Sequence, residues 1–79
     1  MDHTLIERGN RASELLNNDT YKLVTDALVN DFKTRWTQTE PANKAEREEY
    51  YYAIVALAYV HQTLTAWMDS GKLEANKSE

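Results

Sequence analysis

The sequence predicts an all-α protein: an antiparallel hairpin of two helices (the second and third along the chain), preceded by a short N-terminal helix. Three observations support this fold class. Apolar residues recur at helical spacing in three segments, cap-forming residues stand before them, and the 79 residues include only one Pro and two Gly. A chain of this length makes one domain, spanning residues 1–79, in which we expect residues 74–79 to form a disordered tail.

The first helix is predicted over residues 5–16. Thr4 and Glu7 have the spacing of a capping box, directly before an apolar pattern. Gly9 interrupts that pattern at a cost of about 1 kcal/mol relative to Ala. Because glycine has no side chain, Gly9 also allows another backbone to approach the helix.

The second helix is predicted to start within the turn-forming residues 17–19 and to end near Thr37. Its apolar residues share one face: they are Tyr21, Val24, Leu28, Phe32 and Trp36. Pro41 disfavours helix at the residue before it and therefore marks the second turn. A short connection of this kind favours an antiparallel neighbour.

The third helix is the longest, and it is predicted from Lys44 to Ser70, with Gly71 at its end. Asn43 and Glu46 have the spacing of a cap at its start. Residues 50–60 read YYYAIVALAYV, without one charged side chain. A membrane span requires about 20 apolar residues, so this run predicts a helix that packs against protein.

Apolar residues lie on two sides of this third helix, which indicates two packing surfaces. The expected core between the second and third helices consists of Leu28, Phe32, Ile54, Leu57 and Leu64. The opposite side carries the candidate interface residues Tyr51, Tyr52, Val55, Tyr59 and Ala66. Two helices cannot cover both sides of a third. We therefore expect a homo-oligomer, or a different protein partner, on the second side.

Composition narrows the functional classes. The formal charge of −4, from 13 acidic and 9 basic residues, argues against direct nucleic-acid binding and, more weakly, against an anionic membrane surface. The start of the chain does not have the layout of a signal peptide, so we expect a cytoplasmic location. The absence of cysteine excludes disulfides and thiolate metal sites, which leaves oligomerisation or good helix packing to stabilise so small a domain.

The sequence offers little for catalysis. It contains no Gly-rich phosphate loop and no nucleophile candidate, and a zinc site would need more converging ligands than His3 and His61 provide. We predict no enzyme activity, cofactor or metal. His61 lies on the core side of the third helix, where it is either a pH-sensitive residue or ligand, or an ordinary core histidine.

Several short patterns resemble a family of small, uncharacterised helical proteins of tailed bacteriophages. They are Arg8-Gly9 with Ala12 and Leu15-Leu16, Asn18 with Tyr21, Trp36 with Thr39, Arg47-Glu48, and Gly71-Lys72-Leu73 with Ala75. Asp19-Thr20 departs from the family pattern, which favours Pro soon after the Asn. The resemblance to this family assigns no catalytic residues to this chain.

The resemblance implies a role in virion assembly, DNA packaging or a related accessory function. Together with the two apolar sides of the third helix, it predicts a homo-oligomeric interaction protein. Such a protein would be found in the cytoplasm of the host cell or associated with the virion, with a phage or host protein as a further partner. The alternative is a phage-encoded inhibitor that binds a host protein through Tyr52, Val55 and Tyr59.

Overall fold

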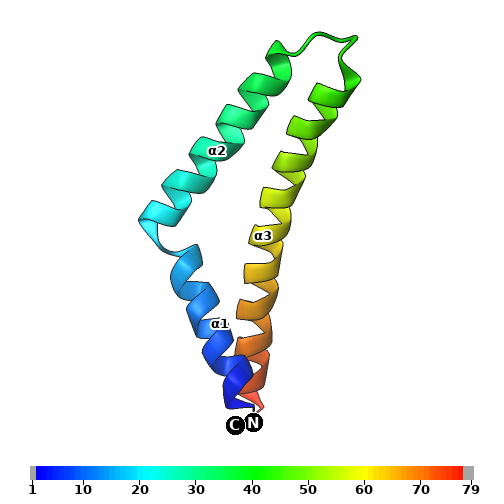
Figure 1. Cartoon of the computed structure of the whole chain (residues 1–79). Helices are drawn as coiled ribbons and strands as arrows, with labels where there is room; N and C mark the ends of the chain where they lie inside the picture. The colour runs from blue at the N-terminus through cyan, green and yellow to red at the C-terminus, as the bar shows by residue number, and fades with distance from the viewer. Residues whose placement is uncertain (1, 78–79) are drawn as a thin grey trace.

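The computed structural model describes residues 2–77 and consists of three α-helices. Helix α1 spans His3–Leu16, α2 spans Asp19–Gln38 and α3 spans Lys44–Asn76 (Figure 1). The described residues include no β-strand, and α3 is the longest helix. The prediction of an all-α chain with three helices is therefore confirmed.

Side-chain caps set the starts of α1 and α2. The Asp2 carboxylate accepts hydrogen bonds from the backbone N–H groups of Thr4 and Leu5, so α1 begins two residues before its predicted start. Thr4 consequently lies inside the helix. The Asn18 side-chain oxygen accepts from the N–H of Tyr21 at 2.9 Å, which places the start of α2 where the turn residues predicted it.

The cap of α3 is reciprocal, as the residue spacing predicted. Asn43 Oδ1 accepts from the backbone N–H of Glu46 at 3.3 Å, and Asn43 Nδ2 donates to the Glu46 carboxylate at 2.7 Å. The predicted end of this helix is wrong. Gly71 is not a terminator, because α3 continues through it to Asn76. Residues 74–76, which we expected in a disordered tail, are helical, and residues 78–79 lie outside the described part.

Gly71 is needed instead for a close helix contact between α1 and α3. Gly9 and Gly71 are both buried where the two helices cross. A methyl group added to Gly9 would lie 2.8 Å from the Trp67 carbonyl oxygen and 2.9 Å from the Cα of Gly71. Backbones this close leave no room for a side chain. Ala12 and Leu64, on the same sides of their helices, are the buried apolar side chains of the described residues.

Helix α2 packs less extensively on α3 than α1 does. Figure 1 shows that α2 is near α3 at the turn that joins them and diverges toward α1. The expected core between these helices is wrong in part for this reason. Phe32, Ile54 and Leu57 are only half-buried and Leu28 is exposed, whereas Leu64 is buried on the side of α3 that faces α1.

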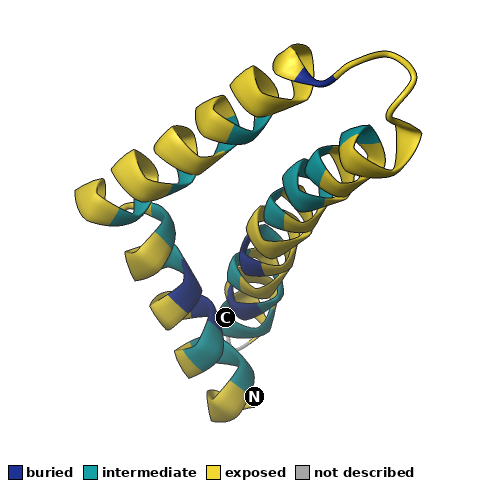
Figure 2. Cartoon of the chain, turned by 45° about the horizontal axis from the view of Figure 1, so that its top comes forward, coloured by how far each residue is buried: buried dark blue, intermediate teal, exposed yellow. Residues whose placement is uncertain are grey.

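Exposure is therefore unevenly distributed along the molecule. Figure 2 shows α2 exposed along most of its length, with the buried residues gathered on α1 and on the C-terminal half of α3. A separate buried position is Thr39, just after α2, whose hydroxyl donates to the Trp36 carbonyl oxygen at 2.6 Å. The molecule measures 57 × 23 × 14 Å, and its long axis follows α3.

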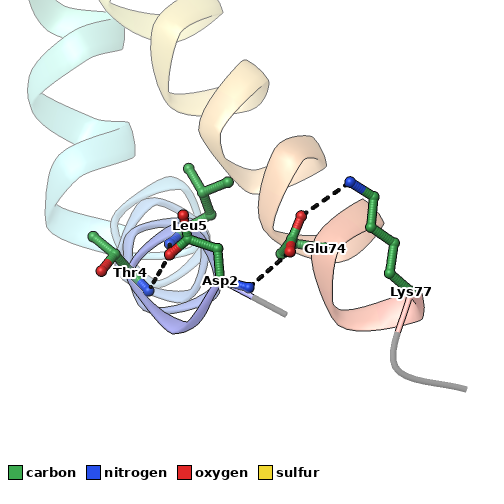
Figure 3. Close-up of polar contacts among 5 residues, drawn as sticks. All are labelled: Asp2, Thr4, Leu5, Glu74 and Lys77. Atoms are coloured by element: carbon green, nitrogen blue, oxygen red, sulfur yellow. Dashed lines mark hydrogen bonds and ion pairs between the residues drawn. The ribbon is translucent and has the colours of Figure 1, made fainter.

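Polar contacts join the start of α1 to the end of α3 (Figure 3). The backbone N–H of Asp2 donates to the Glu74 carboxylate at 2.7 Å, and Lys77 Nζ lies 3.2 Å from the other carboxylate oxygen. The Glu74 side chain is only 13% exposed. The Asp2 hydrogen bond and then the Lys77 ammonium lower the pKa of Glu74, because both favour the ionised form.

This carboxylate predicts an acid sensitivity. Since the folded pKa of Glu74 is lowered, its contribution to stability is complete at neutral pH. That contribution is lost as the pH falls below the ordinary glutamate pKa of about 4.3 and through the folded value. Chemical denaturation between neutral and acidic pH should show that Glu74→Gln is less sensitive to acid than the wild type. Glu14→Gln, at an exposed position of α1, is the control. Equal acid sensitivity of Glu74→Gln and the wild type would contradict this role.

Candidate interaction surface

The outward side of α3 carries an uncovered row of aromatic and small side chains. Tyr52 and Tyr59 are 62% and 63% exposed, although most of each ring is apolar. Ala66 continues the same line and is exposed, and Val55 beside it is half-buried. Positions 52, 59 and 66 are seven residues apart, so they share one face of a long helix. The structure thus places these four predicted interface residues together.

Tyr51 does not belong to that row. Its ring meets the Tyr52 ring edge-on, with 5.7 Å between centroids, but its position is about 100° further round the helix. It lines an open pocket of about 410 Å³ with Trp36, Pro41 and Arg47, at the turn between α2 and α3. The five predicted interface residues therefore occupy two different surfaces.

Two further residues complete the row, and the apolar pattern of the sequence did not single them out. Ala56 and Thr63 are exposed and lie four residues after Tyr52 and Tyr59, respectively. The signal that could have found them is the alternation of four- and three-residue steps, which marks a continuous seam on a helix. We call Tyr52, Ala56, Tyr59, Thr63 and Ala66 the α3 seam.

An apolar hollow borders the α3 seam on one side. It has a volume of about 330 Å³ and is open to solvent. Its lining consists of Tyr59, Val60, Thr63, Leu64 and Trp67. Val60 is itself half exposed, so the apolar surface of α3 is wider than the seam alone.

His61 is not a core residue, and our placement of it on the core side of the third helix is wrong. It is exposed on an open groove of about 360 Å³ between α2 and α3. The opposite wall includes Tyr21, Thr25 and Val29. The physical reason is that α2 diverges from α3, so the groove that His61 lines is open to solvent.

Two arginines stack on tryptophans between helices. The guanidinium of Arg8 on α1 lies 4.7 Å from the Trp67 ring centroid on α3, and the buried Nε of Arg8 has no hydrogen-bond partner. Arg47 on α3 lies 4.5 Å from the Trp36 ring centroid on α2. These cation–π contacts help to hold the helices together, so neither arginine is simply available for an anionic ligand.

The other two arginines, Arg11 and Arg35, have acidic partners on their own helices. Arg11 pairs with Glu7 at 2.6 Å and Arg35 with Asp31 at 2.9 Å. The Tyr50 hydroxyl and then the Asp31 carboxylate raise the pKa of Arg35, which stays charged at every ordinary pH. The exposed pairs contribute little to stability, and the four arginines engage different partners.

The described residues contain little else that suggests a functional site. Between residues 2 and 77, no three His, Asp or Glu side chains converge as a metal site would require. In the same part of the chain, no helix combines the length and apolar character that a membrane span needs. What the arrangement presents is an apolar helix surface.

Comparisons with protein-family models, with curated proteins and with solved structures found no match.

Proposed function

We propose that this chain is a small, phage-type helical interaction protein that acts as a homo-oligomer in virion assembly, DNA packaging or a related accessory role. The phage assignment rests on the sequence patterns that resemble the phage family. The oligomer has a phage or host protein as a further partner, and it acts in the host cytoplasm or within the virion. Catalysis, a cofactor, direct nucleic-acid contact and a membrane are not part of this proposal.

The observation that carries the proposal is the amount of surface that the single chain exposes. Its accessible area is 6027 Å², whereas a compact monomer of 9.2 kDa is expected to expose about 4,900 Å². Its radius of gyration is 17.1 Å, against about 12 Å for a compact domain of this length. The excess area is about 1,100 Å², and a stable interface covers about 800 Å² on each partner.

The shortage of buried apolar residues supports the same proposal. Ala12 and Leu64 are the apolar residues that the described chain buries, whereas Leu23, Tyr52 and Tyr59 are each more than half exposed. A core this small rarely supplies more than about 3–5 kcal/mol, so covering further apolar surface by association would add stability. In our proposal α2 and α3 form the antiparallel hairpin that associates, and association covers the α3 seam.

Charge placed on the α3 seam should separate the copies. The double variant Tyr52→Glu with Tyr59→Lys would bury two charges in an apolar contact, so we expect its native mass to fall to that of one chain. Size-exclusion chromatography with light scattering measures this mass. Leu23→Glu with Asn30→Lys is the matched control, since it places the same charges at the same spacing on exposed positions of α2. The control should keep the wild-type mass.

A wild-type monomer at high protein concentration would contradict self-association. The face that carries Tyr52, Val55 and Tyr59 would then be assigned to a foreign protein, as an inhibitor of a host enzyme requires. Affinity purification from infected cells with mass spectrometry would identify that protein.

A further inference from the structure

We infer that two copies of this chain pair through their α3 seams in antiparallel orientation, with Tyr52 of each copy opposite Thr63 of the other. The two-fold axis then passes between the levels of Leu57 and Ala58. This pairing specifies the partner and geometry of the surface in the proposed function and therefore rests on it. A two-fold contact uses the same surface on both copies, so the seam must fit itself.

The order of side chains along the α3 seam favours the antiparallel orientation. One set of positions seven residues apart holds the rings Tyr52 and Tyr59, and the alternate set holds the small residues Ala56 and Thr63. Two helices that run in parallel would set each ring against its own copy and each small residue against its own copy. Rings in contact would hold the backbones apart and leave voids between the small residues, which close packing disfavours.

Antiparallel pairing alternates large and small side chains instead. In the inferred register Tyr52 meets Thr63 and Tyr59 meets Ala56. The two-fold axis repeats both pairs, so four successive layers each contain one ring and one small side chain. Every layer then has a similar volume, and the helices can stay at one separation along the contact.

A register displaced by one heptad is less well packed. Tyr52 would then meet Ser70 and Tyr59 would meet Thr63, but Ala56 would meet Ala66. Two layers would contain no ring, and each would leave a void beside the tyrosines. The inferred register avoids these voids, and it keeps the Glu49 carboxylate at the end of the seam, where water can reach it.

The exposed area of the whole chain is large enough for a second copy to be the occupant. Neither α1 nor α2 covers the α3 seam, since its two rings and its three small side chains are all exposed. The single chain exposes about 1,100 Å² more than a compact monomer of its mass, and a standard interface covers about 800 Å² per partner. Each copy contributes both rings and small side chains, so the rings of one copy can pack against the small side chains of the other.

Disulfide crosslinking tests this pairing directly, because the native chain has no cysteine. Tyr52→Cys and Thr63→Cys are prepared as separate variants of the full chain, mixed, allowed to exchange subunits and oxidised. We expect a disulfide-linked heterodimer on a non-reducing gel, with its mass confirmed by mass spectrometry. Neither variant alone should crosslink, because each cysteine would lie about 16 Å along the axis from its counterpart, and a disulfide requires Cα atoms within about 7 Å.

The matched control mixes Tyr52→Cys with Gln62→Cys. Gln62 is exposed and precedes Thr63, but it points about 100° away around the helix, so no crosslink is expected. Crosslinking of Tyr52→Cys with itself would show a parallel pair, and crosslinking with Ser70→Cys in place of Thr63→Cys would show the displaced register. Either result would overturn the inference.

Light scattering separates failure of this pairing from failure of the proposed function. A wild-type dimer whose cysteine variants remain dimeric without crosslinking would overturn the inferred pairing and leave the homo-oligomer intact. A wild-type monomer would overturn both.

Discussion

Gly9→Ala should lower the free energy of unfolding by about 1–3 kcal/mol, the usual cost of overpacking, although Ala is the better helix former by about 1 kcal/mol. The added methyl would lie 2.8 Å from the Trp67 carbonyl oxygen and 2.9 Å from the Cα of Gly71. These are backbone atoms, so α1 and α3 must move apart. The separation would loosen the buried contacts of Ala12 and Leu64. Chemical denaturation at one fixed protein concentration measures the change.

The control for this prediction is Asn10→Ala, the next residue of α1, which is exposed. It gains helix propensity without a clash, so it should be neutral or stabilising. Gly71→Ala should behave like Gly9→Ala, because its methyl would lie 2.9 Å from the Cα of Gly9 and 3.1 Å from the Leu5 carbonyl oxygen. If Gly9→Ala were as stable as Asn10→Ala, the helix crossing would not be as close as described.

Leu64→Ala should lower the free energy of unfolding by about 2–5 kcal/mol, the range for a large side chain removed from a core. Leu64 is only 9% exposed, and it is the one large apolar side chain among the described residues that is buried. Removing it leaves a cavity on the side of α3 that faces α1. The measurement is again the midpoint and slope of chemical denaturation.

Two leucines that are more exposed than Leu64 provide the comparison variants. Leu57→Ala should cost less than Leu64→Ala, since Leu57 is half-buried at the groove between α2 and α3. Leu23→Ala should change the free energy of unfolding by less than about 0.5 kcal/mol, because Leu23 is 71% exposed. Equal losses for Leu64 and Leu57 would show that α2 closes on α3 in solution and that the core lies where the sequence alone predicted it.

The candidate surface was partly predictable. Tyr52, Tyr59 and Ala66 are at helical spacing, so the sequence indicated a second apolar side on the third helix. Ala56 and Thr63 were missed because small residues carry a weak apolar signal. Their importance depends on which sides of α3 are covered by α1 and α2. Tyr51 was assigned to the same surface because it lies next to Tyr52 in sequence, but neighbours on a helix point about 100° apart.

The sequence by itself determined the fold class, the number of helices and most of their starts. These depend on interactions between residues close in the chain, such as the bonds from Asn18 to Tyr21 and between Asn43 and Glu46. Local patterns of this kind are readable without a tertiary structure.

Only the tertiary structure decided which helices pack closely. A glycine near the end of an apolar segment fits a helix terminator and a close backbone contact equally well, and Gly71 is buried in such a contact with Gly9, 62 positions earlier in the chain. The exposure of His61 likewise depends on the angle at which α2 leaves α3. Spacing along one helix shows which residues share a face, but the approach of distant backbones determines which face is covered.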